Sequence, residues 1–192
     1  EPEIAHQAEL SYGLNTGSDF FMNTALFWKQ TDNSIIQFVE IDNNGISYTS
    51  KQNLAAYRQY GLNLSATANL TQQWGLNGNI NINHLDYSSS ALSVLRKGWA
   101  TDFNLNTTYK LPRNFSVQAF GEYNTRMVTL LGYRTGRYYY SFAGKKEFKK
   151  IKINVTLAAV NLFNKFISQE DVFERPDFYS RIDNRYYSRA VK

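Results

Sequence analysis

The 192-residue chain lacks cysteine and has only three prolines, two methionines and two histidines, His6 and His84. Without thiols it can form neither a disulfide framework nor a thiolate zinc site, and it has no cysteine nucleophile. No apolar stretch approaches the roughly 18 residues that a transmembrane helix needs. The start, Glu1–Glu3, is not the basic and then apolar segment of a signal peptide. These absences exclude thiol chemistry and helical membrane spans.

Aromatic residues are abundant, with 14 tyrosines, 13 phenylalanines and 3 tryptophans making up 16% of the chain. The mean hydropathy is nevertheless −0.47, because 20 asparagines dilute the apolar residues. This combination is unusual for a soluble core. The net charge of +5 leaves nucleic acid, anionic lipid and acidic ligands open as partners.

Apolar and polar residues alternate along most of the chain. In Gly61–Leu70, Leu62 and Leu64 interleave with Asn63 and Ser65, which is the pattern of a strand with one apolar and one polar face. The same pattern elsewhere predicts nine strands. They are Ile4–Tyr12, Phe20–Trp28, Gly61–Leu70, Leu76–Asn83, Asp102–Tyr109, Phe115–Tyr123, Tyr138–Lys145, Ile151–Ala159 and Asn184–Lys192.

Short and long connections alternate between these strands. This pattern is typical of an antiparallel transmembrane β-barrel, which has tight turns at one rim and longer loops at the other. We expect short turns at Gly13–Ser18, Thr71–Gln73, Leu111–Asn114 and Lys145–Lys150. The long connections would be Lys29–Gln59, with its own strand-like piece Ser34–Glu40, and Asp86–Gly98, Asn124–Arg137 and Asn161–Asp183.

The polar face is built mainly from Asn, Thr and Ser and lacks the Lys and Glu density of a water-exposed exterior. A soluble lipocalin-like barrel or β-sandwich remains the alternative, because both also alternate. Aromatic residues near the strand ends favour the membrane barrel, since they would form its two interfacial girdles. They are Tyr12, Phe20, Trp74, Tyr109 and Phe115 at the short turns, and Tyr87, Trp99, Tyr123 and Tyr138 toward the long connections. The candidate lumen-lining residues are Asn63, Asn79, Asp102, Asn104, Glu122, Lys152 and Thr156.

Nine strands do not make a complete bacterial single-chain barrel, which has an even number. A self-contained eight-stranded structural barrel would fit the length but would leave Asn184–Lys192 without a place. The odd count favours a piece of a larger barrel.

The segment Asn161, Leu162, Phe163 and Asn164 resembles the Asn-Leu-Phe-Asn motif that ends the penultimate strand of TonB-dependent outer-membrane receptors, in particular the outer-membrane β-barrel family of Bacteroidetes type. This marker and four weaker matches cover essentially the whole chain in order. The weaker matches are Glu1–Glu3, Ala25–Thr31, Tyr60–Ser65 and Tyr138–Lys146.

The resemblance implies that residues 1–192 are the C-terminal part of an outer-membrane barrel of about 22 strands that takes up a bulky solute. It also implies partners: outer-membrane lipid, a plug domain and further strands outside this chain, TonB reached through the missing N-terminal region, and a surface lipoprotein. The ligand would be a siderophore, an oligosaccharide or a similar molecule. One departure is the end at Val191–Lys192, where such receptors usually carry an aromatic residue.

We expect no enzyme, cofactor or metal site. His84, Asp86 and the serines from Ser88 to Ser90 form the one plausible nucleophile–base cluster, and a polar strand end running into a serine-rich loop explains them better. Carboxylates could hold calcium, although a solvated loop interleaved with arginines is the simpler interpretation. The lysine pairs at Lys145–Lys150 suit lipid phosphates better than nucleic acid. The carboxylates in question are Glu170, Asp171, Glu174 and Asp177.

Overall fold

The computed structural model describes residues 2–42, 44, 46–175 and 178–192. These residues form antiparallel strands and one 3-10 turn, η1 (Pro112–Asn114). None of them forms a helix long and apolar enough to cross a membrane. The strands are β1 (Ile4–Asn15), β2 (Phe20–Ile41), β3 (Ser47–Asn69), β4 (Trp74–Ser89), β5 (Val94–Leu111), β6 (Phe115–Asn124), β7 (Met127–Thr129), β8 (Gly132–Arg134), β9 (Arg137–Phe148), β10 (Ile153–Val160), β11 (Phe166–Arg175), β12 (Phe178–Tyr187) and β13 (Ala190–Val191).

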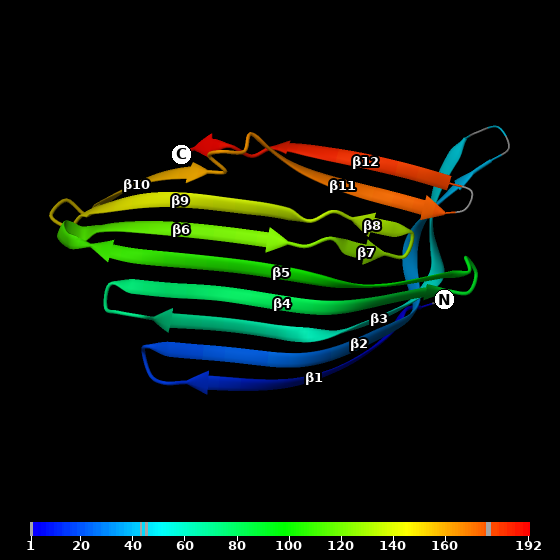
Figure 1. Cartoon of the computed structure of the whole chain (residues 1–192), viewed down its shortest axis with the longest axis horizontal. Helices are drawn as coiled ribbons and strands as arrows, with labels where there is room; N and C mark the ends of the chain where they lie inside the picture. The colour runs from blue at the N-terminus through cyan, green and yellow to red at the C-terminus, as the bar shows by residue number, and fades with distance from the viewer. Residues whose placement is uncertain (1, 43, 45, 176–177) are drawn as a thin grey trace.

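Nine of these strands form one antiparallel sheet in the order β1-β2-β3-β4-β5-β6-β9-β10-β13 (Figure 1). A second sheet, β12-β11-β8-β7, continues it at one end. We call its two hairpins, β7–β8 and β11–β12, the rim hairpins. The predicted all-β antiparallel class is confirmed, and the main sheet is open, with β1 at one edge and β10 with β13 at the other.

Two predicted long connections are wrong because the strands extend far beyond their alternating segments, and a third, Asn124–Arg137, contains the β7–β8 hairpin. β2 continues to Ile41 and β3 begins at Ser47, so the expected connection Lys29–Gln59 is mostly paired strand. The strand-like piece Ser34–Glu40 belongs to β2, and the register shift between Thr31 and Ser34 separates it from the first half. Likewise β4 and β5 pair throughout most of 86–98.

The predicted ninth strand is also placed differently. Residues 184–187 belong to β12, which pairs with β11 in a rim hairpin that occupies most of the expected connection Asn161–Asp183 and extends beyond it. Only β13 joins the main sheet, where Val191 lies opposite Ala159. The alternating pattern at the chain end therefore spans two strands of different sheets.

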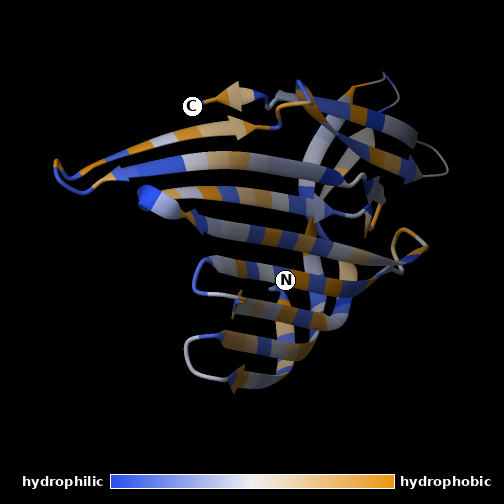
Figure 2. Ribbon diagram, turned by 60° about the vertical axis from the view of Figure 1, so that its left-hand side comes forward, coloured by the Kyte–Doolittle hydropathy of each residue, from blue (hydrophilic) through white to orange (hydrophobic). Residues whose placement is uncertain are grey.

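The main sheet has two chemically distinct faces, because hydrophobic and hydrophilic residues alternate along its strands (Figure 2). The apolar face carries exposed side chains such as Leu10 and Leu157, which are 74% and 65% exposed. The polar face is the shielded one, where Asn83 is only 5% exposed and Ala25 is also buried. This inside-out arrangement is unfavourable in water and favourable in hydrocarbon. It agrees with the predicted membrane barrel.

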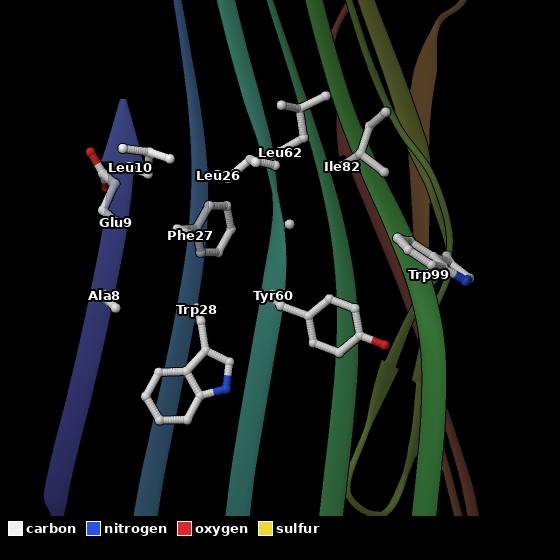
Figure 3. Close-up of a pocket in the computed structure, with 11 residues that line it drawn as sticks. Ala8, Glu9, Leu10, Leu26, Phe27, Trp28, Tyr60, Leu62, Ile82 and Trp99 are labelled. Atoms are coloured by element: carbon white, nitrogen blue, oxygen red, sulfur yellow. The ribbon is translucent and has the colours of Figure 1, made fainter. Parts of the chain in front are cut away.

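Aromatic residues form two rows across the apolar face. Trp28, Tyr60, His84 and Trp99 lie opposite one another on β2 to β5, and Trp28, Tyr60 and Trp99 border a hollow of about 610 Å³ (Figure 3). At the other end Trp74 of β4 lies opposite Tyr109 of β5. The two rows are ten residues apart on both strands, which is about 34 Å along the strand.

A strand tilt of about 40° reduces this length to a height of about 26 Å, close to the lipid-facing band of such barrels. We call the row of Trp28, Tyr60, His84 and Trp99 the upper row. The apolar face becomes charged immediately beyond it, where Lys97 forms an ion pair of 2.9 Å with Asp86. Charged residues thus border the apolar band beyond the row that contains His84 and Trp99.

Arginine at Leu64 should destabilise the folded protein by about 2–4 kcal/mol, because Leu64 lies opposite Ile80 near the middle of the apolar band. Urea unfolding of the intact protein in lipid vesicles measures this cost. Asn63→Arg is the matched control on the polar face. Equal effects at the two positions would contradict the assignment of the faces.

Candidate functional site: the polar wall and the rim hairpins

Two adjacent rows of polar side chains cross the middle of the polar face, and we call them the polar wall. One row consists of directly paired residues on β3, β4, β5, β6 and β9, and the other lies next to it on β4, β5 and β6. The first row is Asn63, Asn81, Asp102, Asn124 and Arg137, and the second is Asn79, Asn104 and Glu122. The structure therefore brings together five predicted lumen-lining residues that come from four strands.

Side-chain hydrogen bonds join the polar wall across the strands. Asn79 Nδ2 donates to Asn63 Oδ1 over 3.3 Å. Farther along, Asn124 Nδ2 donates to Asp102 Oδ1 over 2.7 Å, and Arg137 Nε donates to Asn124 Oδ1 over 3.2 Å. Such a surface can hold water or a polar solute by hydrogen bonds.

Two predicted wall residues lie elsewhere. Lys152 is not on the polar face, because it sits in the β9–β10 turn with φ 55°, before β10 begins. Thr156 is on the polar face opposite Lys145, near the short turns and away from the wall. Three wall residues were not among the predicted ones: Asn81, and Asn124 and Arg137, whose positions depend on cross-strand pairing.

Beyond the upper aromatic row, the polar face carries a tyrosine pair. The rings of Tyr57 and Tyr87 stack with centroids 4.7 Å apart, so Tyr87 is not part of the predicted girdle, and His84 occupies that row instead. Burial, together with the neighbouring Tyr87, raises the pKa of Tyr57. Its hydroxyl therefore stays protonated and donates to Gln59 Oε1.

The rim hairpins contact the wall side of β5. Gly98 faces Val128 of β7 so closely that an added Cβ would lie 2.7 Å from Val128 Cγ1. Arg96 reaches β11, where its Nη2 donates to the carbonyl oxygen of Glu174 over 3.1 Å. This end of the polar face is therefore partly covered.

Three of the four carboxylates proposed as calcium ligands are paired with arginines. Arg134 pairs with Asp171 at 2.6 Å, Arg181 pairs with Glu170, and Arg96 lies 3.5 Å from Glu174. Asp177 lies outside the described residues. Within the described ranges, no group of three or more acidic or histidine side chains could hold a metal ion.

The two candidate base residues, His84 and Asp86, each contact other side chains rather than a serine. The His84 ring lies between Tyr60 and Trp99, with centroids at 4.8 and 5.0 Å. Asp86 pairs with Lys97 on the same lipid-facing surface. Neither side chain is oriented toward a serine by a hydrogen bond that would activate it.

The Asn161–Asn164 motif joins the main sheet to a rim hairpin. Asn161 is 1% exposed, has φ 43° and follows the last residue of β10. Its Oδ1 accepts a hydrogen bond from the Tyr140 backbone nitrogen over 2.8 Å, and its own nitrogen donates to the Tyr140 carbonyl. The side chain thus supplies the acceptor that β10 loses where it bends away from β9.

Asn164 completes this joint from the other side of the bend. It accepts from the Tyr140 hydroxyl over 3.2 Å and donates to the Tyr138 hydroxyl over 2.7 Å. The Tyr140 hydroxyl oxygen also accepts a hydrogen bond of 2.9 Å from the Phe163 backbone nitrogen. Leu162 and Phe163 are exposed and face outward. The two asparagines of the motif therefore make the hydrogen bonds that hold the bend.

An inside-out antiparallel sheet with two aromatic rows defines the wall of a transmembrane β-barrel. The model of the outer membrane protein beta-barrel family matches residues 1–192, and the chain belongs to this family. Its location is therefore the bacterial outer membrane, which does not favour the soluble alternatives. No curated protein and no solved structure matched the chain.

Replacing Asn161 by alanine should destabilise the protein by about 2–4 kcal/mol. The substitution leaves the Tyr140 N–H without its acceptor and places alanine at positive φ. Denaturant unfolding of the intact protein measures the loss. Asn154→Ala, at an exposed site of β10, should change stability by less than about 0.5 kcal/mol, and a similarly small effect at Asn161 would refute the proposed joint.

Alanine at Gly132 should separate the rim hairpins, because a Cβ there would collide with the backbone carbonyl of Val172 in β11. External protease should then cleave the rim of intact outer membranes about tenfold faster. Gly121→Ala is the matched control, since nothing lies within 4 Å of its added Cβ. Unchanged cleavage of the Gly132 variant would show that β8 and β11 do not need this close approach.

Proposed function

We propose that the chain is the C-terminal part of the barrel of a TonB-dependent outer-membrane receptor, of the kind found in Bacteroidetes, that imports a bulky polar solute. The observation that carries this proposal is the polar wall on an open sheet. A wall of amides and charged groups, on the face opposite the exposed leucines, is suited to a wide aqueous interior.

The open edges support a barrel larger than this segment. In hydrocarbon every backbone N–H and C=O must be paired, so a sheet edge cannot face lipid. β1 presents twelve residues at one edge, and β13 covers only the end of β10 at the other. Further strands of the intact protein would pair with these edges and close the barrel.

The segment's own contribution would be passive and non-enzymatic. The apolar face would contact lipid, the polar wall would line the path around a plug domain, and the rim hairpins would contribute to ligand capture. Energy would come from TonB acting on the plug, which lies outside this chain, and a surface lipoprotein could cover the rim. The ligand class remains a siderophore or an oligosaccharide, since the wall presents both amides and charges.

Cells that make the intact protein should accumulate one class of a panel of ferric siderophores and oligosaccharides, and deletion of TonB should abolish that uptake. Gly132→Ala should lower uptake by disturbing the rim, whereas Gly121→Ala should not.

Uptake that persists at the same rate without TonB would refute the transporter mechanism and would indicate a passive pore. Correct insertion of every variant is checked by the shift in electrophoretic mobility on heating. A complete and stable eight- or nine-stranded barrel formed by residues 1–192 alone would instead favour a self-contained structural role.

A further inference from the structure

Unpaired positive charge gathers at the short-turn end of the main sheet. It lies on two turns, η1 between β5 and β6, and the turn between β9 and β10 (Figure 1). The two turns are neighbours because β6 pairs with β9, which places Phe115 opposite Lys146. The Lys146 ammonium also donates to the Arg113 carbonyl and so connects them. We call Arg113, Lys146, Lys149, Lys150 and Lys152 the basic collar.

The carboxylate of Glu147 offsets this charge only in small part, through a minor attraction to Lys149. Glu147 is adjacent in sequence, but it forms an ion pair of 2.7 Å with Lys145, and this contact lowers the pKa of Glu147. Among the described residues, no ion pair includes a member of the basic collar. At the opposite end, by contrast, Arg96, Arg134 and Arg181 each pair with a carboxylate. The collar therefore keeps a strong local positive potential.

Exposed apolar side chains accompany the collar on the lipid-facing surface. Phe148 and Ile153 lie opposite each other at the end of the β9–β10 hairpin, and Ile151 lies between two collar lysines in the turn. Lys146 shares the apolar face with Val155, and its Nζ is 5.9 Å from the centre of the Phe148 ring. Cations beside exposed apolar groups fit the boundary between lipid headgroups and acyl chains.

We propose that the basic collar binds the phosphate headgroups of anionic phospholipids in the leaflet at the short-turn end. Lysine and arginine would donate charge-assisted hydrogen bonds to phosphate oxygens, while Phe148, Ile151 and Ile153 pack on the adjacent acyl chains. A membrane location is sufficient for this site, so it does not depend on the proposed transport. Each basic residue near an anionic surface contributes about a fivefold gain in binding.

The test uses the full-length protein in phosphatidylcholine vesicles with spin-labelled phosphatidylglycerol or phosphatidylcholine, at low and high salt. Electron spin resonance gives the relative association constant of the two lipids. Wild type should prefer phosphatidylglycerol at low salt. The double variant Lys149→Gln, Lys150→Gln should lose about tenfold or more of the site's affinity, and high salt should weaken the wild-type preference.

The matched control is Lys51→Gln, Lys165→Gln, which removes the same charge from exposed positions away from the short turns. The control should bind phosphatidylglycerol as wild type does. Three results would overturn the proposal: no lipid preference in wild type, an unchanged preference in the collar variant, or an equal loss in both variants. Because Lys149 and Lys150 are exposed turn residues, the collar variant should keep its heat-modifiable electrophoretic mobility. A Lys150→Gln single variant should lose less affinity for phosphatidylglycerol than the double variant, which gives a second measurement.

Discussion

The structure depends on the need to pair every backbone hydrogen-bonding group where no water is available. Long antiparallel ladders meet this need along β2 to β5, and they leave side-chain chemistry free to sort by face. The result is a sheet whose apolar face carries exposed leucines such as Leu10 and Leu157, while Asn83 on the polar face is buried. A soluble sheet with the same alternation would have the opposite arrangement, so the solvent rather than the pattern decides which face is enclosed.

Register determines whether this sorting works. Because side chains alternate with period two, a slip of one residue between β4 and β5 would carry Trp99 to the polar face and Asp102 toward lipid. The aligned aromatic pairs His84 with Trp99 and Trp74 with Tyr109 fix this register at both membrane boundaries. The same residues therefore place the apolar band at the depth of the bilayer and stabilise the pairing of β4 with β5.

The alternating pattern was sufficient to predict the two faces of the main sheet and five residues of the polar wall, because hydrocarbon imposes strict alternation between the aromatic rows. Outside the band both faces meet water, the alternation fades, and the outer halves of β2 and β3 looked like a loop. Pattern alone also assigned Lys152 to a face although its positive φ makes it a turn residue. The partner of Asn161, Tyr140, lies 21 residues earlier in the chain, so only the fold reveals the contact.

The bend at Asn161 separates two parts of the molecule that are subject to different demands. On one side the sheet must match the fixed thickness of a bilayer, and on the other the rim hairpins pair mainly with each other. Insertions or exchanges of sequence within the rim hairpins would therefore leave the span intact. Such a division lets one scaffold acquire new surface specificities without being rebuilt.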